Sequence, residues 1–166
     1  MILSVADRKN VPRGKWLSPS EWSEVMKKMP IACLDLVVER SDNSILYGWR
    51  IIGPYRNVWA LPGGRILHRE SLTQCARRIA CEYGLRFREL YLIGVSTISF
   101  QLRSDISITA AALKVSGEPR VDGFEFSRFI WSRNPPPRLG SSYHKAVSKW
   151  KHAKANDKFM ELNRLL

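Results

Sequence analysis

Two glutamates stand among several arginines in a segment that opens with a double-glycine turn. This segment is Trp59–Leu85, "WALPGGRILHRESLTQCARRIACEYGL", and its carboxylates are Glu70 and Glu82. Carboxylate oxygens can hold a divalent cation such as Mg²⁺, which neutralises a phosphorylated substrate. Arginine side chains can bind the same phosphate oxygens through paired hydrogen bonds. The segment therefore has the residue types needed for metal-assisted chemistry on a phosphorylated compound.

An amphipathic helix is predicted to position the two glutamates. Apolar or small residues recur at the spacing of one helix face from about Glu70 to Tyr83, namely at Leu72, Cys75, Ala76, Ile79 and Ala80. Gly84 follows at the place of a helix C-cap glycine. The Pro-Gly-Gly turn before the helix follows a short strand in "VWALPGG".

The remaining chain alternates helices and strands without a regular βαβ pattern. Ser18, Pro19 and Glu21 predict a helix start, and this helix should run over about residues 18–29 and stop at Pro30. Strands are predicted at 31–40 and 45–52, paired as a hairpin, and at 88–102, 106–115 and 126–131. A basic helical tail should occupy about 143–166, with Val147, Trp150, Phe159, Leu162 and Leu165 toward the body. The prediction is one mixed α/β domain over residues 1–166.

The composition favours a globular protein that binds anions. The chain has 166 residues, a formal net charge of +12 and 45% hydrophobic residues. This charge favours nucleotides, phosphosugars or nucleic acid as partners, although general solubility charge is the alternative. The three cysteines have no metal-ligand spacing and are expected to fill core positions in a reducing compartment. No apolar run is long enough to span a bilayer, and "MILSVADRKN" has no signal-peptide core, so a cytoplasmic protein without a membrane partner is expected.

The glycine loop and the following helix resemble the Nudix box. Gly64, then five residues, Glu70, then seven residues and Arg78 fit the first half of that pattern, while Gly84-Leu85 fit its end one residue early. The deletion leaves two registers open, in which Glu82 takes either the first or the second place of the paired glutamates. The acid that should follow the box arginine is absent in both registers. The segment 59–85 thus keeps part of the acidic cluster of the family.

The wider sequence resembles the GDP-mannose mannosyl hydrolase branch of the Nudix family. The matching features are a helix that ends at Pro30, the pair Leu34-Asp35, and "GWRIIGPYRNVWALPGGR" over Gly48–Arg65. The resemblance covers roughly residues 18–150. It implies a Nudix fold with a mixed β-sheet between α-helices, and hydrolysis of a nucleotide sugar such as GDP-mannose to a nucleoside diphosphate and free sugar. It also implies Mg²⁺, or Mn²⁺ in its place, and a homodimer.

The resemblance also implies roles for individual residues. Gly64, Glu82, Glu70 and Glu125 are the candidate metal ligands, with Glu125 also a candidate base. Arg50 and Arg65 match arginines that stabilise the leaving nucleoside diphosphate. Arg78 matches the box arginine, which holds the glycine loop, with a plain surface charge as the alternative. Asp35 matches a residue near the nucleotide, with a structural aspartate at the end of a buried strand as the alternative. Phe126 stands where the branch has its histidine base, and a phenyl ring cannot accept a proton.

Two other functions compete with nucleotide-sugar hydrolysis. One is pyrophosphohydrolysis of another nucleotide or of a capped RNA end, which normally recruits more acids than this box has. The other is a degraded Nudix domain that binds nucleotide or RNA, which the +12 charge and the missing box acid favour. A hydrolase should need a divalent cation and Glu82, whereas a binding module should hold anions without metal and with a steep salt dependence.

Overall fold

Two β-sheets and the helices packed on them make up the computed structural model, which describes residues 18–53, 55–100, 103–121, 123–158 and 160–162. The larger sheet has the strand order β4-β1-β6-β5-β8 and the smaller one the order β3-β2-β7. The helices are α1 (Pro19–Lys28), α2 (Leu72–Glu82) and α3 (Ser141–Ala155). The strands are β1 (Ile31–Val38), β2 (Ile45–Arg50), β3 (Val58–Ala60), β4 (Gly63–Arg65), β5 (Glu89–Ser99), β6 (Ser104–Leu113), β7 (Phe126–Ser132) and β8 (Met160–Glu161).

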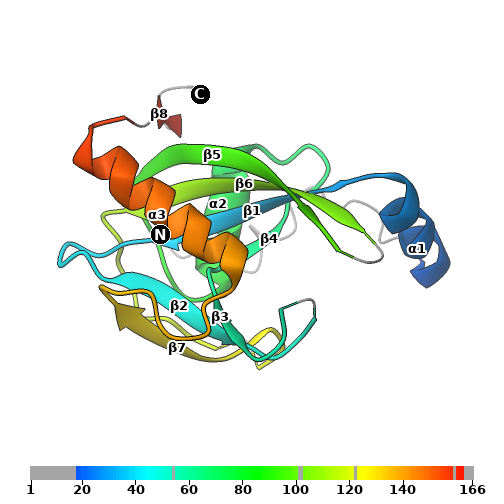
Figure 1. Ribbon diagram of the computed structural model, residues 1–166, viewed down its shortest axis with the longest axis horizontal. Helices are drawn as coiled ribbons and strands as arrows, with labels where there is room; N and C mark the ends of the chain where they lie inside the picture. The colour runs from blue at the N-terminus through cyan, green and yellow to red at the C-terminus, as the bar shows by residue number, and fades with distance from the viewer. Residues whose placement is uncertain (1–17, 54, 101–102, 122, 159, 163–166) are drawn as a thin grey trace, which may run out of the picture.

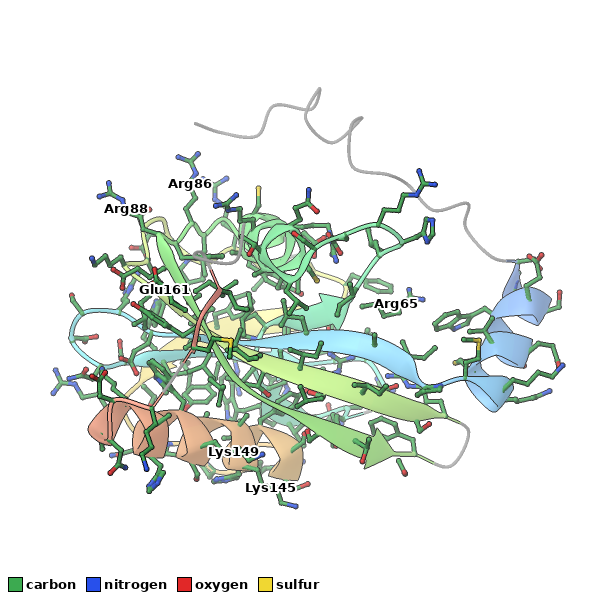
Figure 2. All side chains as sticks on the ribbon, turned by 90° about the horizontal axis from the view of Figure 1, so that it is seen from above. Arg65, Arg86, Arg88, Lys145, Lys149 and Glu161 are labelled. Atoms are coloured by element: carbon green, nitrogen blue, oxygen red, sulfur yellow. The ribbon has the colours of Figure 1, made fainter. Side chains whose placement is uncertain are left out.

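The layers are those that the sequence predicts. Helices α2 and α3 lie on opposite sides of the larger, mixed sheet (Figure 2), while α1 stands at one end of the molecule (Figure 1). The core fills the space between these layers with side chains from β1, β2, α2, β6 and α3, including Leu36, Leu46, Ile79, Ala111 and Trp150. The mixed sheet between helices is therefore confirmed.

Strand β1 is the spine of the larger sheet, and its pairing corrects the predicted hairpin. It runs parallel to β6, from Ile31 opposite Asp105 to Val38 opposite Ala112, and antiparallel to β4 on its other side. Strand β2 belongs to the smaller sheet, and the two segments meet where the chain turns, at the bridge between Glu39 and Ile45 and the backbone hydrogen bond of 3.0 Å from Arg40 to Ser44. The apolar run of β1 explains the difference, because a strand covered on both faces suits the centre of a sheet rather than a half-exposed hairpin.

Local sequence signals set the helix boundaries. Ser18 and Glu21 form the predicted capping box at the start of α1. Ser71 and Gln74 form a second capping box on α2. Helix α2 ends at Glu82, with Tyr83 as its C-cap, and Gly84 follows with a φ of 76°, which favours glycine over other residues.

The C-terminal tail differs from the predicted continuous helix. Helix α3 ends at Ala155, with Asn156 as its C-cap, and the short strand β8 further along the chain pairs with β5. Val147, Trp150 and Leu162 are buried as expected, whereas Phe159 and Leu165 lie outside the described residues. The indole N–H of Trp150 donates a hydrogen bond of 2.8 Å to Glu39, which fixes α3 to the end of β1.

None of the described helices combines the length and the apolar character needed to cross a membrane.

Candidate functional site

Arg78 links the two box glutamates to the glycine loop. Its guanidinium holds Glu70 with two hydrogen bonds, of 2.7 and 2.9 Å, and donates a third of 2.8 Å to the carbonyl of Arg65. A fourth bond of 3.1 Å reaches Glu82, one helical turn further along α2. Arg78 therefore holds the loop in place, as the resemblance to the box predicts for this arginine.

Glu70 is buried and uses both of its carboxylate oxygens in hydrogen bonds within the site. Its side chain is only 3% exposed, and its second oxygen also accepts the amide of Leu67 at 2.9 Å. Burial works against the ionised form, but the hydrogen bonds from Arg78 and Leu67 outweigh it and lower the pKa of Glu70. The pairing of Glu70 with Arg78 supports the register in which Glu82 takes the first place of the glutamate pair. Ligation of a metal by Glu70 stays a prediction.

Glu82 is the box carboxylate that remains accessible. Its side chain is 51% exposed, and Arg78 contacts one of its two oxygens. Among the residues that the structure describes, no group of three or more His, Cys, Asp or Glu side chains comes together to hold a metal. The donors present suit Mg²⁺ or Mn²⁺ only as a site with one side-chain carboxylate, because Mg²⁺ commonly takes its other ligands from water and substrate phosphates. Gly64 lies against Ile79 and Arg78 of the same helix, which puts its backbone near this end of the site.

Arg50 and Glu125 form a second group, separate from the box pair. They are joined by an ion pair, and both side chains are largely buried. Glu125 also accepts a hydrogen bond of 3.4 Å from the hydroxyl of Tyr83, the residue that follows Glu82. The structure thus brings Arg50 and Glu125 together, while Glu125 as a metal ligand or base stays a prediction. Phe126 is fully buried, and its ring packs edge-on against Tyr83, so this position is part of the core.

Asp35 carries the most unusual carboxylate of the site. It pairs across the sheet with Gly63 of the glycine loop, and a Cβ atom on Gly63 would lie 2.5 Å from one of its oxygens. Its other oxygen accepts a hydrogen bond of 2.6 Å from the hydroxyl of Ser107. Burial raises the pKa of Asp35 to about 6, although Ser107 and the nearby Arg50 favour the ionised form. A carboxyl group with this pKa can take up and release a proton near neutral pH.

A cavity of about 270 Å³ opens over Asp35 on the side of the sheet that α3 covers. Its floor is formed by Asp35, Ser107 and Thr109, and one wall follows β5 from Gly94 to Ser99. The facing wall is the start of α3, with Ser141, Ser142, Lys145 and Lys149. The lining is mostly hydroxyl and charged groups, so this cavity suits a polar ligand.

Arg65 lies apart from the cavity. It is exposed, and its guanidinium stacks 4.3 Å from the ring centre of Trp22 on α1 (Figure 2). A cation above a tryptophan ring is attracted by the π electrons and remains available to an anion on its open side. Contact of Arg65 with a phosphate therefore stays a prediction.

Sequence reasoning missed the residues that complete the cavity. Ser107 and Thr109 lie on β6 and become neighbours of Asp35 only through the parallel pairing of β1 with β6. Lys145 and Lys149 were predicted only as part of a basic tail. Their spacing of four residues was the available signal, because it places two lysines on one helix face.

Comparisons with known proteins agree with this architecture. A family model described as "NUDIX domain" matches residues 29–134. A crystal structure of a MutT NUDIX hydrolase from Burkholderia pseudomallei superposes with a TM-score of 0.68 and 22% identity, covering 74% of this chain and 98% of that one. The NUDIX domain of Shewanella oneidensis NrtR, solved as a complex with ADP ribose, superposes with a TM-score of 0.64 and 16% identity, covering 82% of this chain and 98% of that one.

A curated relative matches a shorter stretch. The low-salt glycan biosynthesis protein Agl8 of Haloferax volcanii is 36% identical over 62 residues, which are 37% of this chain and 39% of that protein. The aligned stretch is thus about two fifths of the length of this relative.

Proposed function

Since the chain belongs to the NUDIX domain family, we propose that it hydrolyses a nucleotide sugar similar to GDP-mannose, releasing a nucleoside diphosphate and the free sugar. The observation that carries this proposal is the position of Asp35. This carboxylate borders both the glycine loop that precedes the box helix and a cavity of about 270 Å³ with a polar lining. The partial match to a glycan biosynthesis protein supports the sugar-linked class of substrate.

In the proposed reaction, water attacks the sugar carbon and the bond from this carbon to the diphosphate oxygen breaks. Asp35 takes the proton from the water, because the oxygen that faces Gly63 has no hydrogen bond within the described part of the chain. The nucleoside diphosphate departs with the bonding electrons. Arg65, and Arg50 beside Asp35, stabilise its negative charge.

Glu125 is assigned a positioning role in this scheme. Its ion pair with Arg50 and its hydrogen bond from Tyr83 hold the guanidinium close to Asp35. A carboxylate already bonded to an arginine is a weak proton acceptor, which favours Asp35 over Glu125 as the base.

Glu82, with a backbone carbonyl of the Gly63-Gly64 loop, would hold Mg²⁺ or Mn²⁺. The bound cation would neutralise the diphosphate and so improve it as a leaving group. The exposure of Glu82 leaves room for the water and phosphate ligands that such a site requires. Homodimer formation remains a separate proposal, which rests on the resemblance alone.

The test is product analysis with GDP-mannose and Mg²⁺ in water enriched in the heavy oxygen isotope. Label in the free sugar is the expected result, and both Glu82→Gln and Asp35→Asn should abolish turnover. Label in a phosphate product would instead show attack at phosphorus and a pyrophosphohydrolase.

A nucleotide- or RNA-binding module is the second candidate. It is favoured by the way one arginine holds both box glutamates, and by the net charge of +12. Absence of turnover over a panel of nucleotide sugars and dinucleotides, together with metal-independent and strongly salt-dependent RNA binding, would establish this function instead.

A further inference from the structure

The lysines of α3 fall into two pairs with different surroundings. Lys151 donates to the carbonyl of Arg133, and Lys154 forms an ion pair with Glu39. Lys145 and Lys149 line the cavity instead, and neither has an acidic partner in the part of the chain that the structure describes (Figure 2). Two cations on one helix face beside a cavity are available to a bound anion.

Lys149 reaches across the cavity to β5. Its amine lies 4.0 Å from the position that a Cβ on Gly94 would occupy, so the absence of a side chain there leaves space beside this amine. Lys145 lines the same cavity one helical turn closer to the start of α3.

The start of α3 adds further donors to this end of the cavity. Helices α1 and α2 both have complete capping boxes, whereas Gly140 gives α3 no side-chain cap. Ser142 lines the cavity, and its buried hydroxyl has no hydrogen-bond partner among the residues that the structure describes. Uncapped amides at a helix start carry partial positive charge and favour an anion.

The sheet register gives the distance from this cationic end to Asp35. Asp35 pairs with Thr109 on β6, and Thr109 pairs with Gly94 on β5, so the three residues form one row across the sheet. Two strand spacings of about 4.8 Å separate Asp35 from Gly94, which places them about 10 Å apart. The backbone positions that carry the proposed base and that face the cationic end are therefore about one small ligand apart.

A single sugar with an acidic group fits that span. The path from the reacting carbon of a hexose to a carboxylate on its far side crosses a few bonds of about 1.5 Å, or about 5 Å in all. Hydrogen bonds of about 2.8 Å join the carboxylate to a lysine and the attacking water to the base, and this water lies about 3 Å from the reacting carbon. The path therefore measures about 14 Å along its length, and it spans about 10 Å because it bends at the reacting carbon. The hydroxyls of Ser96, Thr97 and Ser107 line the space between and suit a polyhydroxylated ring.

From these distances and charges we infer that Lys145 and Lys149 recognise a carboxylate on the sugar, so that the substrate is a nucleoside diphosphate-linked hexuronic acid. This inference rests on the proposed function and narrows its substrate class. The lysines would discriminate only weakly against neutral sugars, because both amines would stay in contact with water when a neutral sugar is bound.

The test compares the binding of two probes that differ only at this group, GDP-mannose and GDP-mannuronate, by titration calorimetry without divalent cation. We expect the acid to bind about tenfold more tightly to the unmodified protein, the effect of a hydrogen bond to a charged group. Lys149→Ala, and Lys145→Ala to a smaller degree, should reduce this ratio toward one while leaving GDP-mannose affinity within about twofold. Lys151→Ala removes the same charge from the same helix outside the cavity and should keep the tenfold ratio.

Equal binding of the two probes to the unmodified protein would overturn the inference. So would an equal loss of affinity for both probes in the cavity variants, because the lysines would then act on the diphosphate. Since binding is measured without turnover, the outcome is independent of the proposed reaction: a preserved ratio without hydrolysis would refute the reaction and keep the subsite.

Discussion

Replacement of Asp35 by asparagine should stabilise the protein above neutral pH and abolish its activity. The pKa of Asp35 is raised from its ordinary value of 3.8 to about 6 by burial. This difference means that the ionised carboxylate lowers the free energy of unfolding at pH 7 by about 3 kcal/mol, compared with a neutral group at the same position. An amide cannot ionise, and its oxygen can still accept the hydrogen bond from Ser107. The raised pKa already includes the effect of that bond, so a gain of up to about 3 kcal/mol is expected for Asp35→Asn.

The sign of the pH dependence follows from proton counting. Between pH 3.8 and about 6 the folded protein binds more protons at Asp35 than the unfolded chain does. The contribution of this group to stability therefore falls as the pH rises through that window, and the stabilising effect of the amide grows over the same range. Below that window the variant and the unmodified protein should differ little. Turnover should rise with pH as Asp35 becomes ionised, opposite to its effect on stability.

Urea unfolding followed by tryptophan fluorescence, repeated from pH 4 to pH 8, measures this difference. Subtracting the unfolding free energy of the variant from that of the unmodified protein at each pH removes the contributions of the other acidic groups. Ser107→Ala is the matched control, because loss of the hydroxyl donor should raise the pKa of Asp35 further and move the transition to higher pH. A variant that is less stable by the same amount at every pH would show an ordinary, structural aspartate and would refute the assignment.

Two further pairs of substitutions and one single substitution test other parts of the structure. Glu70→Gln should lower the unfolding free energy by about 3 kcal/mol, because it breaks a buried ion pair. Glu82→Gln replaces an exposed carboxylate and should change the unfolding free energy by under about 0.5 kcal/mol. It should also abolish the binding of Mn²⁺, measured by electron paramagnetic resonance. Equal stability losses would contradict the separate roles. Gly63→Ala should lower the unfolding free energy measured in urea by about 2 kcal/mol and disturb the cavity, because its Cβ would lie 2.5 Å from a carboxylate oxygen. Gly53→Ala is the control, because its Cβ would meet nothing within 4 Å and the substitution should be neutral. A neutral Gly63→Ala would show that the loop can shift. Trp150→Phe should lower the thermal midpoint by leaving a buried carboxylate oxygen without its donor, at about 2 kcal/mol, and an unchanged midpoint would show that water replaces the indole.

Features that depend on nearby residues could be predicted from the sequence. Each such signal lies within a short stretch of sequence. Examples are the capping box of Ser18 and Glu21, the apolar face of α2 and the glycine after this helix. The box pattern also predicted that Arg78 holds the glycine loop, and its bonds to Glu70 and the Arg65 carbonyl agree.

Features that depend on pairing between distant parts of the chain could not be predicted from the sequence. The predicted strands 31–40 and 45–52 follow each other in the sequence, so a hairpin was the simplest inference, but β1 pairs with β6 and β2 pairs with β7, both far along the chain. The ion pair between Arg50 and Glu125 joins residues 75 positions apart, so their separate candidate roles could not reveal it. The raised pKa of Asp35 likewise depends on burial and on Ser107, which come from the folded sheet.

The parallel pairing of β1 with β6 also has a consequence for biosynthesis. Ile31 meets Asp105, so β1 leaves the ribosome 74 residues before the first part of its partner. At about 5–20 residues per second, this strand waits roughly 4–15 s without its parallel partner, so one of its edges stays unpaired. An unpaired strand edge on a nascent chain favours binding by chaperones and misassembly with neighbouring chains. We therefore expect the yield of folded protein to change with translation speed over the codons between β1 and β6.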